Sequence, residues 1–438
     1  MSDPIVPDTS RQQTLAGGLP LVVHPRGGPA ILAARLVVRG GSSRDPEGNR
    51  GAHQLLAGLM TRGCGNLDAE ALADRVEGAG AALRAEAHED GLVIGLKCAA
   101  DDAADLLPLL PEMILRPTLD TDQLELERQL NLQTLQRQRE DPFQLAHDQL
   151  RLLLYGTGPY GHDPLGVEAE LEEVQAEDLR RLQHGLGGDG AVLVLCGQVP
   201  PSVAELLNPG LSQGTGWMTH PPARAPLEPA AAARQEAGPA LACEEQETEQ
   251  LVLMLGRATV PLGHADALAL RLLQTHMGMG MSSRLFQVMR EERGLAYDVG
   301  VHLPARCGPA PFVFHLSTSA DRAEEATTCL LDEWQRLQEE LLSDPERELA
   351  LAKLMGQEAM GRQTCSQIAE REALVLSHGL PADYVEWMLS QAPGLGADDL
   401  RDAARRTLSA PSLSLVGPAA ALRKASGAWE RHAIARGV

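Results

Sequence analysis

The chain has 438 residues, of which 44% are hydrophobic and only 3% aromatic, and its formal net charge is −22. This length suggests at least two domains, with cores built from Leu, Ala and Val and a large helical share. The charge argues against binding to nucleic acid, which needs clustered Lys and Arg, and no apolar run is long enough to span a membrane. The acidic surface favours solubility, and an acidic wall facing basic peptides is a second interpretation.

The first half alternates between predicted strands and helices. Short apolar runs closed by Pro or Gly predict strands at 19–25, 30–41, 81–99 and 190–199. Leucines at helical spacing and local caps predict helices at 50–63, 68–80 and 119–141. Gly63 ends the first helix, Asp68 is a plausible N-cap of the second, and Pro142 stops the third.

The order of elements recurs after residues 201–240, a stretch rich in Pro, Gly and Ala that predicts a linker. Strands are expected at 249–260, 311–320 and 412–417, and helices at 266–278, 282–294, 321–342 and 343–363. The matched order predicts an internal duplication, with domains at 1–200 and 241–438. The expected fold class is α+β, with two homologous α/β domains, each a mainly antiparallel sheet with helices packed on one face.

The seven cysteines are scattered and include no C-x-x-C. This pattern is typical of reduced thiols in a cytoplasmic protein rather than of a disulfide framework or a zinc knuckle. The first residues contain no basic stretch followed by an apolar run, so we expect no secretory signal or transit peptide.

Three segments carry a resemblance to a known family. They read "GSSRDPEGNRGAHQLLAGLMTRG", "LERQLNLQTLQRQREDP" and "MGMGMSSRLFQVMREERGLAYDVG". Together they resemble the pitrilysin/insulinase (M16) family of zinc peptidases. The resemblance covers nearly the whole chain, including the duplicated halves, and its most specific part is the third segment.

The family's zinc motif is degenerate in this sequence. Members carry H-x-x-E-H on the first helix, where the two His bind zinc and the Glu is the general base for water. The matching positions here are His53, Leu56 and Ala57, and a further family ligand would fall near Gln133 or Thr134. Catalytic zinc normally has three protein ligands, and Leu cannot accept a proton. We therefore expect no metal or cofactor in this chain, with His53 an ordinary helix residue.

Other histidines offer no replacement site. The thirteen histidines include no H-x₃-H and no H-x-H. His88 and His162 are isolated, and both are expected at the surface or in turns.

The third segment matches the family's complementary half-site. The resemblance implies that Arg290 and Tyr297 reach the substrate, where a guanidinium and a phenol can donate to a developing oxyanion. The alternative is a helix-surface Arg and a Tyr that begins the next strand. In the preceding "HMGMGMSS" stretch, the small residues either contact an extended peptide or only permit a tight turn. These residues are Gly278, Gly280, Ser282 and Ser283.

The resemblance implies a non-catalytic subunit of a heterodimeric zinc metallopeptidase, with zinc in a partner subunit and a peptide as substrate. Such a chain would be inactive alone. The alternative is a catalytically dead peptide-binding or scaffold subunit. An independent hydrolase is the least supported hypothesis, because the sequence contains no G-x-S-x-G and no convincing Cys/His pair.

Overall fold

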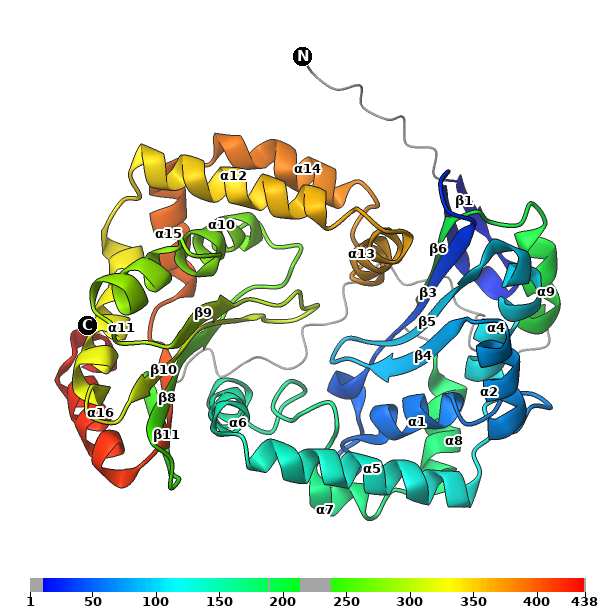
Figure 1. Ribbon diagram of the computed structural model, residues 1–438, viewed down its shortest axis with the longest axis horizontal. Helices are drawn as coiled ribbons and strands as arrows, with labels where there is room; N and C mark the ends of the chain where they lie inside the picture. The colour runs from blue at the N-terminus through cyan, green and yellow to red at the C-terminus, as the bar shows by residue number, and fades with distance from the viewer. Residues whose placement is uncertain (1–10, 188–189, 213–237, 437–438) are drawn as a thin grey trace. The chain divides into compact units, whose positions relative to one another are not determined.

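The computed structural model describes residues 11–187, 190–212 and 238–436, which fold into two compact units. Unit 1 contains the described residues of 1–133, 163–226 and 360–382. Unit 2 contains those of 134–162, 227–359 and 383–438. Each unit holds one β-sheet with helices packed against it (Figure 1).

The sheet of unit 1 has six strands in the order β1-β2-β6-β3-β5-β4. The strands are β1 (Arg11–Thr14), β2 (Pro20–Pro25), β3 (Ile31–Arg39), β4 (Ala82–Ala87), β5 (Gly91–Ala99) and β6 (Ala191–Gly197). Only the β2–β6 pair is parallel, and the other pairs are antiparallel. All residues of β6 are buried, because it is a central strand covered on both faces.

Helices cover both faces of this sheet. The unit contains α1 (Ala52–Met60), α2 (Ala69–Gly78), α3 (Ala103–Leu106), α4 (Leu109–Leu115), most of α5 (Thr121–Arg139), α7 (Glu168–Leu171), α8 (Ala176–Gly185), α9 (Val203–Ser212) and α13 (Cys365–Ser377). Asp68 caps α2 as predicted, since its carboxylate accepts from the Ala71 amide at 2.9 Å. In Figure 1, α13 lies on the face opposite α2, α4 and α9, where it packs against β3 and β6.

The sheet of unit 2 has five strands in the order β7-β11-β8-β10-β9. They are β7 (Ala240–Glu245), β8 (Gln250–Ala258), β9 (Asp298–His302), β10 (Pro311–Ser319) and β11 (Ser412–Gly417). The β7–β11 pair is parallel and the rest are antiparallel. The core of the unit centres on Trp334, whose ring makes edge contacts with Phe312 and Phe314 and whose Nε1 donates to the Leu408 carbonyl at 3.0 Å.

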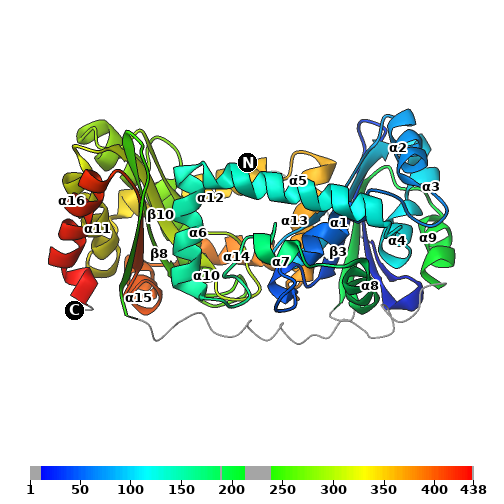
Figure 2. The same cartoon turned by 90° about the horizontal axis from the view of Figure 1, so that it is seen from below.

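Unit 2 also has helices on both sheet faces. They are α6 (Pro142–Tyr155), α10 (Ala267–Gly278), α11 (Ala323–Glu339), α12 (Asp344–Met360), α14 (Tyr384–Gln391), α15 (Ala397–Thr407) and α16 (Ala419–Arg431). Figure 2 shows α6 against the strands, on the face opposite α11 and α16. Helix α6 buries Ala146, Leu150 and Leu154 in a cluster with residues of β8, β10 and β11.

The two sheets confirm the predicted fold class and the internal duplication. The order β2-β6-β3-β5-β4 in unit 1 matches β7-β11-β8-β10-β9 in unit 2, with the same parallel pair and the same chain order. The prediction that helices pack on only one face of each sheet is wrong, because helices cover both faces. Each unit contains one helix from the other half of the chain, α13 in unit 1 and α6 in unit 2, and this helix covers the second sheet face.

The predicted linker at 201–240 is partly wrong. Residues 203–212 form α9, which buries Val203, Leu207 and Leu211 at helical spacing. Pro209 lies inside this helix. Because proline usually interrupts a helix, the sequence predicted a linker here instead. Residue 240 begins β7, and residues 213–237 lie outside the described residues.

Within the described ranges, no helix combines the length and apolar character needed to cross a bilayer. All seven cysteines lie in these ranges, and all are free thiols. Cys64, Cys98, Cys196, Cys329 and Cys365 are buried, whereas Cys243 is exposed.

Cysteine labelling should follow this burial. Burial raises the pKa of the Cys64, Cys98 and Cys329 thiols to about 11, so the thiolate that reacts with maleimides is scarce at pH 7.5. We expect Cys243 to be labelled within minutes in native protein and these three thiols only after unfolding. Peptide mapping after pulsed labelling measures this, and rapid native labelling of Cys98 would contradict the described packing of β5.

Candidate functional site

A buried carboxylate fixes His53 at the start of α1. One oxygen of Asp45 accepts from the His53 amide at 2.9 Å and from His53 Nδ1 at 2.7 Å, and the other accepts from the Gly51 amide at 2.7 Å. The two side chains are only 0% and 3% exposed. An ionised carboxylate can only accept hydrogen bonds, so His53 Nδ1 carries the proton. Nε2 is on the side of the ring away from Asp45.

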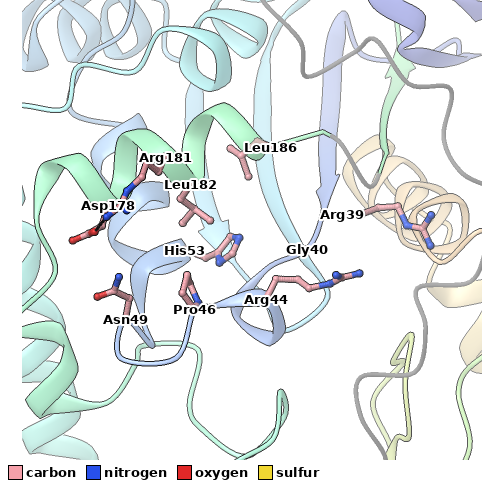
Figure 3. Close-up of a pocket in the computed structure, with 11 residues that line it drawn as sticks. Arg39, Gly40, Arg44, Pro46, Asn49, His53, Asp178, Arg181, Leu182 and Leu186 are labelled. Carbon is pink, nitrogen blue, oxygen red and sulfur yellow. Dashed lines mark hydrogen bonds and ion pairs between the residues drawn. The ribbon is translucent and has the colours of Figure 1, made fainter.

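His53 lines a cavity of about 470 Å³ that lies wholly within unit 1. Figure 3 shows its imidazole pointing toward the segment that carries Gly40 and Arg44. A Cβ placed on Gly40 would lie 3.8 Å from His53 Nε2, so this glycine borders the nitrogen closely. The cavity is lined by Arg39, Gly40, Arg44, Pro46, Asn49, His53, Asp178, Arg181, Leu182, Gly185 and Leu186.

The residues around His53 do not fit a zinc ion. Leu56 and Ala57 are fully buried and have no ligand atoms. Among the described residues, no group of three His, Cys, Asp or Glu side chains able to hold a metal includes His53. Glu127 of α5 lies beside Gly58 of α1. Its carboxylate accepts from Arg62 Nε at 2.6 Å. One imidazole with these neighbours cannot replace the three protein ligands of a catalytic zinc.

We therefore expect the purified chain to hold no stoichiometric zinc at His53. Elemental analysis after dialysis against a weak chelator measures this, and His53→Ala should leave the metal content unchanged. One zinc per chain that disappears in His53→Ala would contradict our interpretation of the half-site.

Unit 2 brings together the two residues predicted for the complementary half-site. The Arg290 guanidinium carbon lies 4.9 Å from the ring centroid of Phe286 and 5.7 Å from that of Tyr297. Arg290 Nη1 also donates to the Tyr297 carbonyl at 3.1 Å. Two cation–π contacts and one hydrogen bond thus hold the guanidinium beside Tyr297.

The helix that carries Arg290 is not the α-helix predicted for 282–294. Residues Phe286–Glu292 form a π-helix, and it ends where the Leu295 and Ala296 amides both donate to the Met289 carbonyl. Phe286 is the first residue of this π-helix, and its ring lies beneath the guanidinium. Single π-helical turns are rare and occur often at functional sites, but periodicity in sequence cannot distinguish them from α-helix.

Tyr297 is 79% exposed, although its backbone is fixed by donation to the Ser317 carbonyl at 3.2 Å. Its ring precedes β9, the edge strand of the sheet, and no described residue hydrogen-bonds its hydroxyl. A large, anchored aromatic residue with an unused hydroxyl is poorly explained by packing within the unit. It is well placed to contact a bound molecule.

The small residues before Arg290 have separate roles. A Cβ on Gly278 would lie 2.7 Å from the Val301 amide nitrogen, so this glycine allows α10 to approach β9. Gly280 has φ of +72° and forms the turn, as one of the two alternatives predicted. Ser282 is exposed, but Ser283 is buried beneath the turn, so the predicted peptide contact through the Ser283 side chain is not supported.

Two residues that support the half-sites, Asp45 and Phe286, were not predicted from the sequence. Asp45 stands eight positions before His53 in a turn, and Phe286 stands four before Arg290, a spacing that could have suggested contact. His88 is exposed as predicted, and His162 lies in a bend, as the predicted turn requires, although it is only 8% exposed.

Two family models match the chain. The model described as insulinase (peptidase family M16) matches residues 28–165, and the model described as peptidase M16 inactive domain matches residues 174–354. The first match contains His53, and the second contains Arg290 and Tyr297.

Curated relatives and solved structures are similar along almost the whole chain. An uncharacterized zinc protease of Streptomyces coelicolor is 24% identical over 94% of this chain and 90% of its own length. An uncharacterized zinc protease of Mycobacterium bovis is 24% identical over 93% of each. A peptidase M16 inactive domain structure from Pseudomonas fluorescens has a TM-score of 0.84 at 24% identity, covering 94% of this chain and 98% of that one. A Helicobacter pylori protease structure has a TM-score of 0.83 at 18% identity, covering 94% and 100%.

Proposed function

The chain belongs to the insulinase (M16) peptidase family, and we propose that it is the non-catalytic subunit of a two-chain zinc metallopeptidase. One observation carries this proposal. The half-site around His53 lacks the ligands and the base that the family chemistry needs, while the half-site of Arg290 and Tyr297 is fully built and exposed. A zinc-bearing partner subunit with an intact H-x-x-E-H would hold the metal.

This chain would contribute binding and charge stabilisation. The Tyr297 hydroxyl has no competing partner among the described residues, so it is available to donate to the carbonyl oxygen of a bound peptide. The guanidinium of Arg290 is held beside it and supplies a second donor, together with positive charge. Donors fixed before the substrate arrives stabilise a developing oxyanion without reorganising, which is why such groups lower barriers effectively.

The second candidate is a peptide-binding or scaffold subunit without a role in hydrolysis. Leu56 and Ala57 stand where the family motif has its Glu and second His, which is consistent with this candidate, but the anchored and exposed Arg290–Tyr297 pair favours the first candidate. A cytoplasmic location and the lack of nucleic-acid or membrane partners complete the proposal, supported by the scattered free thiols and the charge of −22.

Reconstitution tests the proposed function. The chain alone and a zinc-bearing family partner alone should each cleave a peptide library poorly, and their equimolar mixture should be active. Sedimentation and activity are measured on the same mixture. A complex that forms but gains no activity would favour the scaffold function, and cleavage by this chain alone would contradict both candidates.

A further inference from the structure

We propose that Cys196 and Cys365 form a redox-controlled link between the two halves of the chain. Cys196 belongs to β6 in the first half, and Cys365 begins α13, the helix from the second half that packs on the sheet of unit 1. As thiols the two residues are part of the core of unit 1, and as a disulfide they bond α13 covalently to β6. This role is separate from the proposed function and uses only residues of unit 1.

The pleat of β6 directs the Cys196 side chain toward α13. Residues two apart on a strand share one face of the sheet, and Val192, Val194 and Cys196 all lie in one buried cluster with residues of α13. Cys196 is 0% exposed. Its thiol therefore lies under this helix.

Helical spacing places Cys365 on the face of α13 that covers the sheet. Cys365, Ala369 and Ala373 recur every four residues, and all three belong to the same buried cluster as Cys196. The Cys365 and Cys196 thiols are hydrogen-bonded to each other. A disulfide joins two cysteines whose side chains point toward each other, and these two thiols meet across the helix–sheet interface.

Two ion pairs hold α13 in this register. Glu372 of the helix pairs with His24 of β2. Glu370 Oε2 lies 3.8 Å from Arg35 Nη2 of β3. His24 is also the direct neighbour of Cys196 across the parallel β2–β6 pair. Because these contacts resist sliding of the helix over the sheet, the two thiols stay side by side in the folded chain.

The buried environment makes oxidation slow. Burial, with the neighbouring Cys365 thiol as a second cause, raises the pKa of the Cys196 thiol, so little of its thiolate exists near neutral pH. The thiolate is the nucleophile in thiol–disulfide exchange, so oxidation requires the first turn of α13 to open. Cys365 lies in that turn and is 8% exposed, so a reagent reaches it first. We therefore expect free thiols under reducing conditions and slow disulfide formation under oxidising ones.

Glutathione disulfide is an oxidant of the required class. The Cys365 thiolate attacks one of its sulfur atoms, which forms a mixed disulfide on Cys365 and releases one glutathione. The Cys196 thiolate then attacks the Cys365 sulfur, which forms the protein disulfide and releases the second glutathione. Two protein thiols are oxidised, one glutathione disulfide is reduced to two thiols, and these take up the two protons. A dithiol reductant reverses the reaction.

Incubation of the full chain with glutathione disulfide at about pH 8, followed by acid quenching and peptide mapping without reduction, tests the proposal. We expect one linked pair of peptides that contain Cys196 and Cys365, and the pair should separate on reduction. Oxidation should raise the melting temperature by about 5–10 °C, because the disulfide closes a long loop and restricts the unfolded chain. Cys365→Ser and Cys365→Ala should each abolish the linked peptides and the shift, and their melting in the reduced state checks that they are folded.

Cys98→Ser is the matched control. Cys98 is buried in β5 of the same sheet, five positions from Val93, which packs against the cluster of Cys196. Since strand residues alternate between faces, Cys98 lies on the face opposite α13, and its replacement should leave the linked peptides and the shift unchanged. If the exposed Cys243 is modified but no Cys196–Cys365 peptide forms, or if either cysteine is linked instead to another one, the proposal is wrong. A linked pair that leaves the melting temperature unchanged would equally contradict a link that holds α13 on the sheet.

Discussion

Tyr297→Phe should lower kcat of the reconstituted peptidase on a peptide substrate by about 10²–10³-fold, the usual cost of one oxyanion donor. The substitution removes only the hydroxyl. The ring keeps its position over Arg290, and the backbone bond to Ser317 is unaffected. KM should change little if the hydroxyl acts mainly in the transition state.

Arg290 requires two substitutions, because its guanidinium packs on aromatic rings as well as carrying charge. Arg290→Lys keeps the charge but loses the planar contact, and Arg290→Gln loses both. We expect Arg290→Gln to be the more damaging, with Arg290→Lys partly active.

Arg293→Gln is a suitable control for Arg290, since Arg293 is exposed three positions further along the same segment. It should retain wild-type kcat/KM and partner binding. If Tyr297→Phe and both Arg290 variants match the wild type while binding the partner normally, the pair has no catalytic role. The scaffold function would then replace the proposal.

Local patterns in the sequence were sufficient to predict most strands of the two sheets, but not β1, β7 and β9. Alternating apolar runs closed by Gly or Pro located β2, β3, β8 and β10, and the repeated order predicted the duplication that the strand topology confirms. These features depend on short-range periodicity and turn chemistry. The same applies to the Asp68 cap, whose partner is three residues away.

The features that were missed depend on contacts distant in sequence. Helix α13 packs on β3 and β6, which precede it by more than a hundred residues, and its apolar face gives no indication of which sheet it covers. The π-helix around Arg290 and the burial of Asp45 under His53 also depend on neighbours brought in by the fold. The residue types showed that the half-site of His53 lacks the zinc ligands and the general base. They did not predict the cavity that His53 lines.

The exchanged helices should make each half of the chain unable to fold alone. A fragment of residues 1–225 retains every strand of unit 1 but lacks α13, and a fragment of residues 226–438 lacks α6. Without α13, one sheet face loses its cover, and it carries Val22, Ala33, Val37, Val192, Val194 and Cys196. The orphaned α6 exposes an apolar face of its own in the first fragment.

The size of this effect follows from burial. Re-exposing a fully buried Val costs roughly 1.5–3 kcal/mol, so several together approach the ~5–15 kcal/mol that stabilises a typical domain. We therefore expect fragment 1–225 alone to be aggregated or partly folded, with strong binding of a hydrophobic dye and no cooperative urea transition. Co-expression with fragment 226–438 should restore a soluble complex with near-native circular dichroism, because that fragment supplies α13. A monomeric 1–225 that unfolds cooperatively and binds no dye would show that α13 is dispensable, and the folding unit would then be the continuous half of the chain.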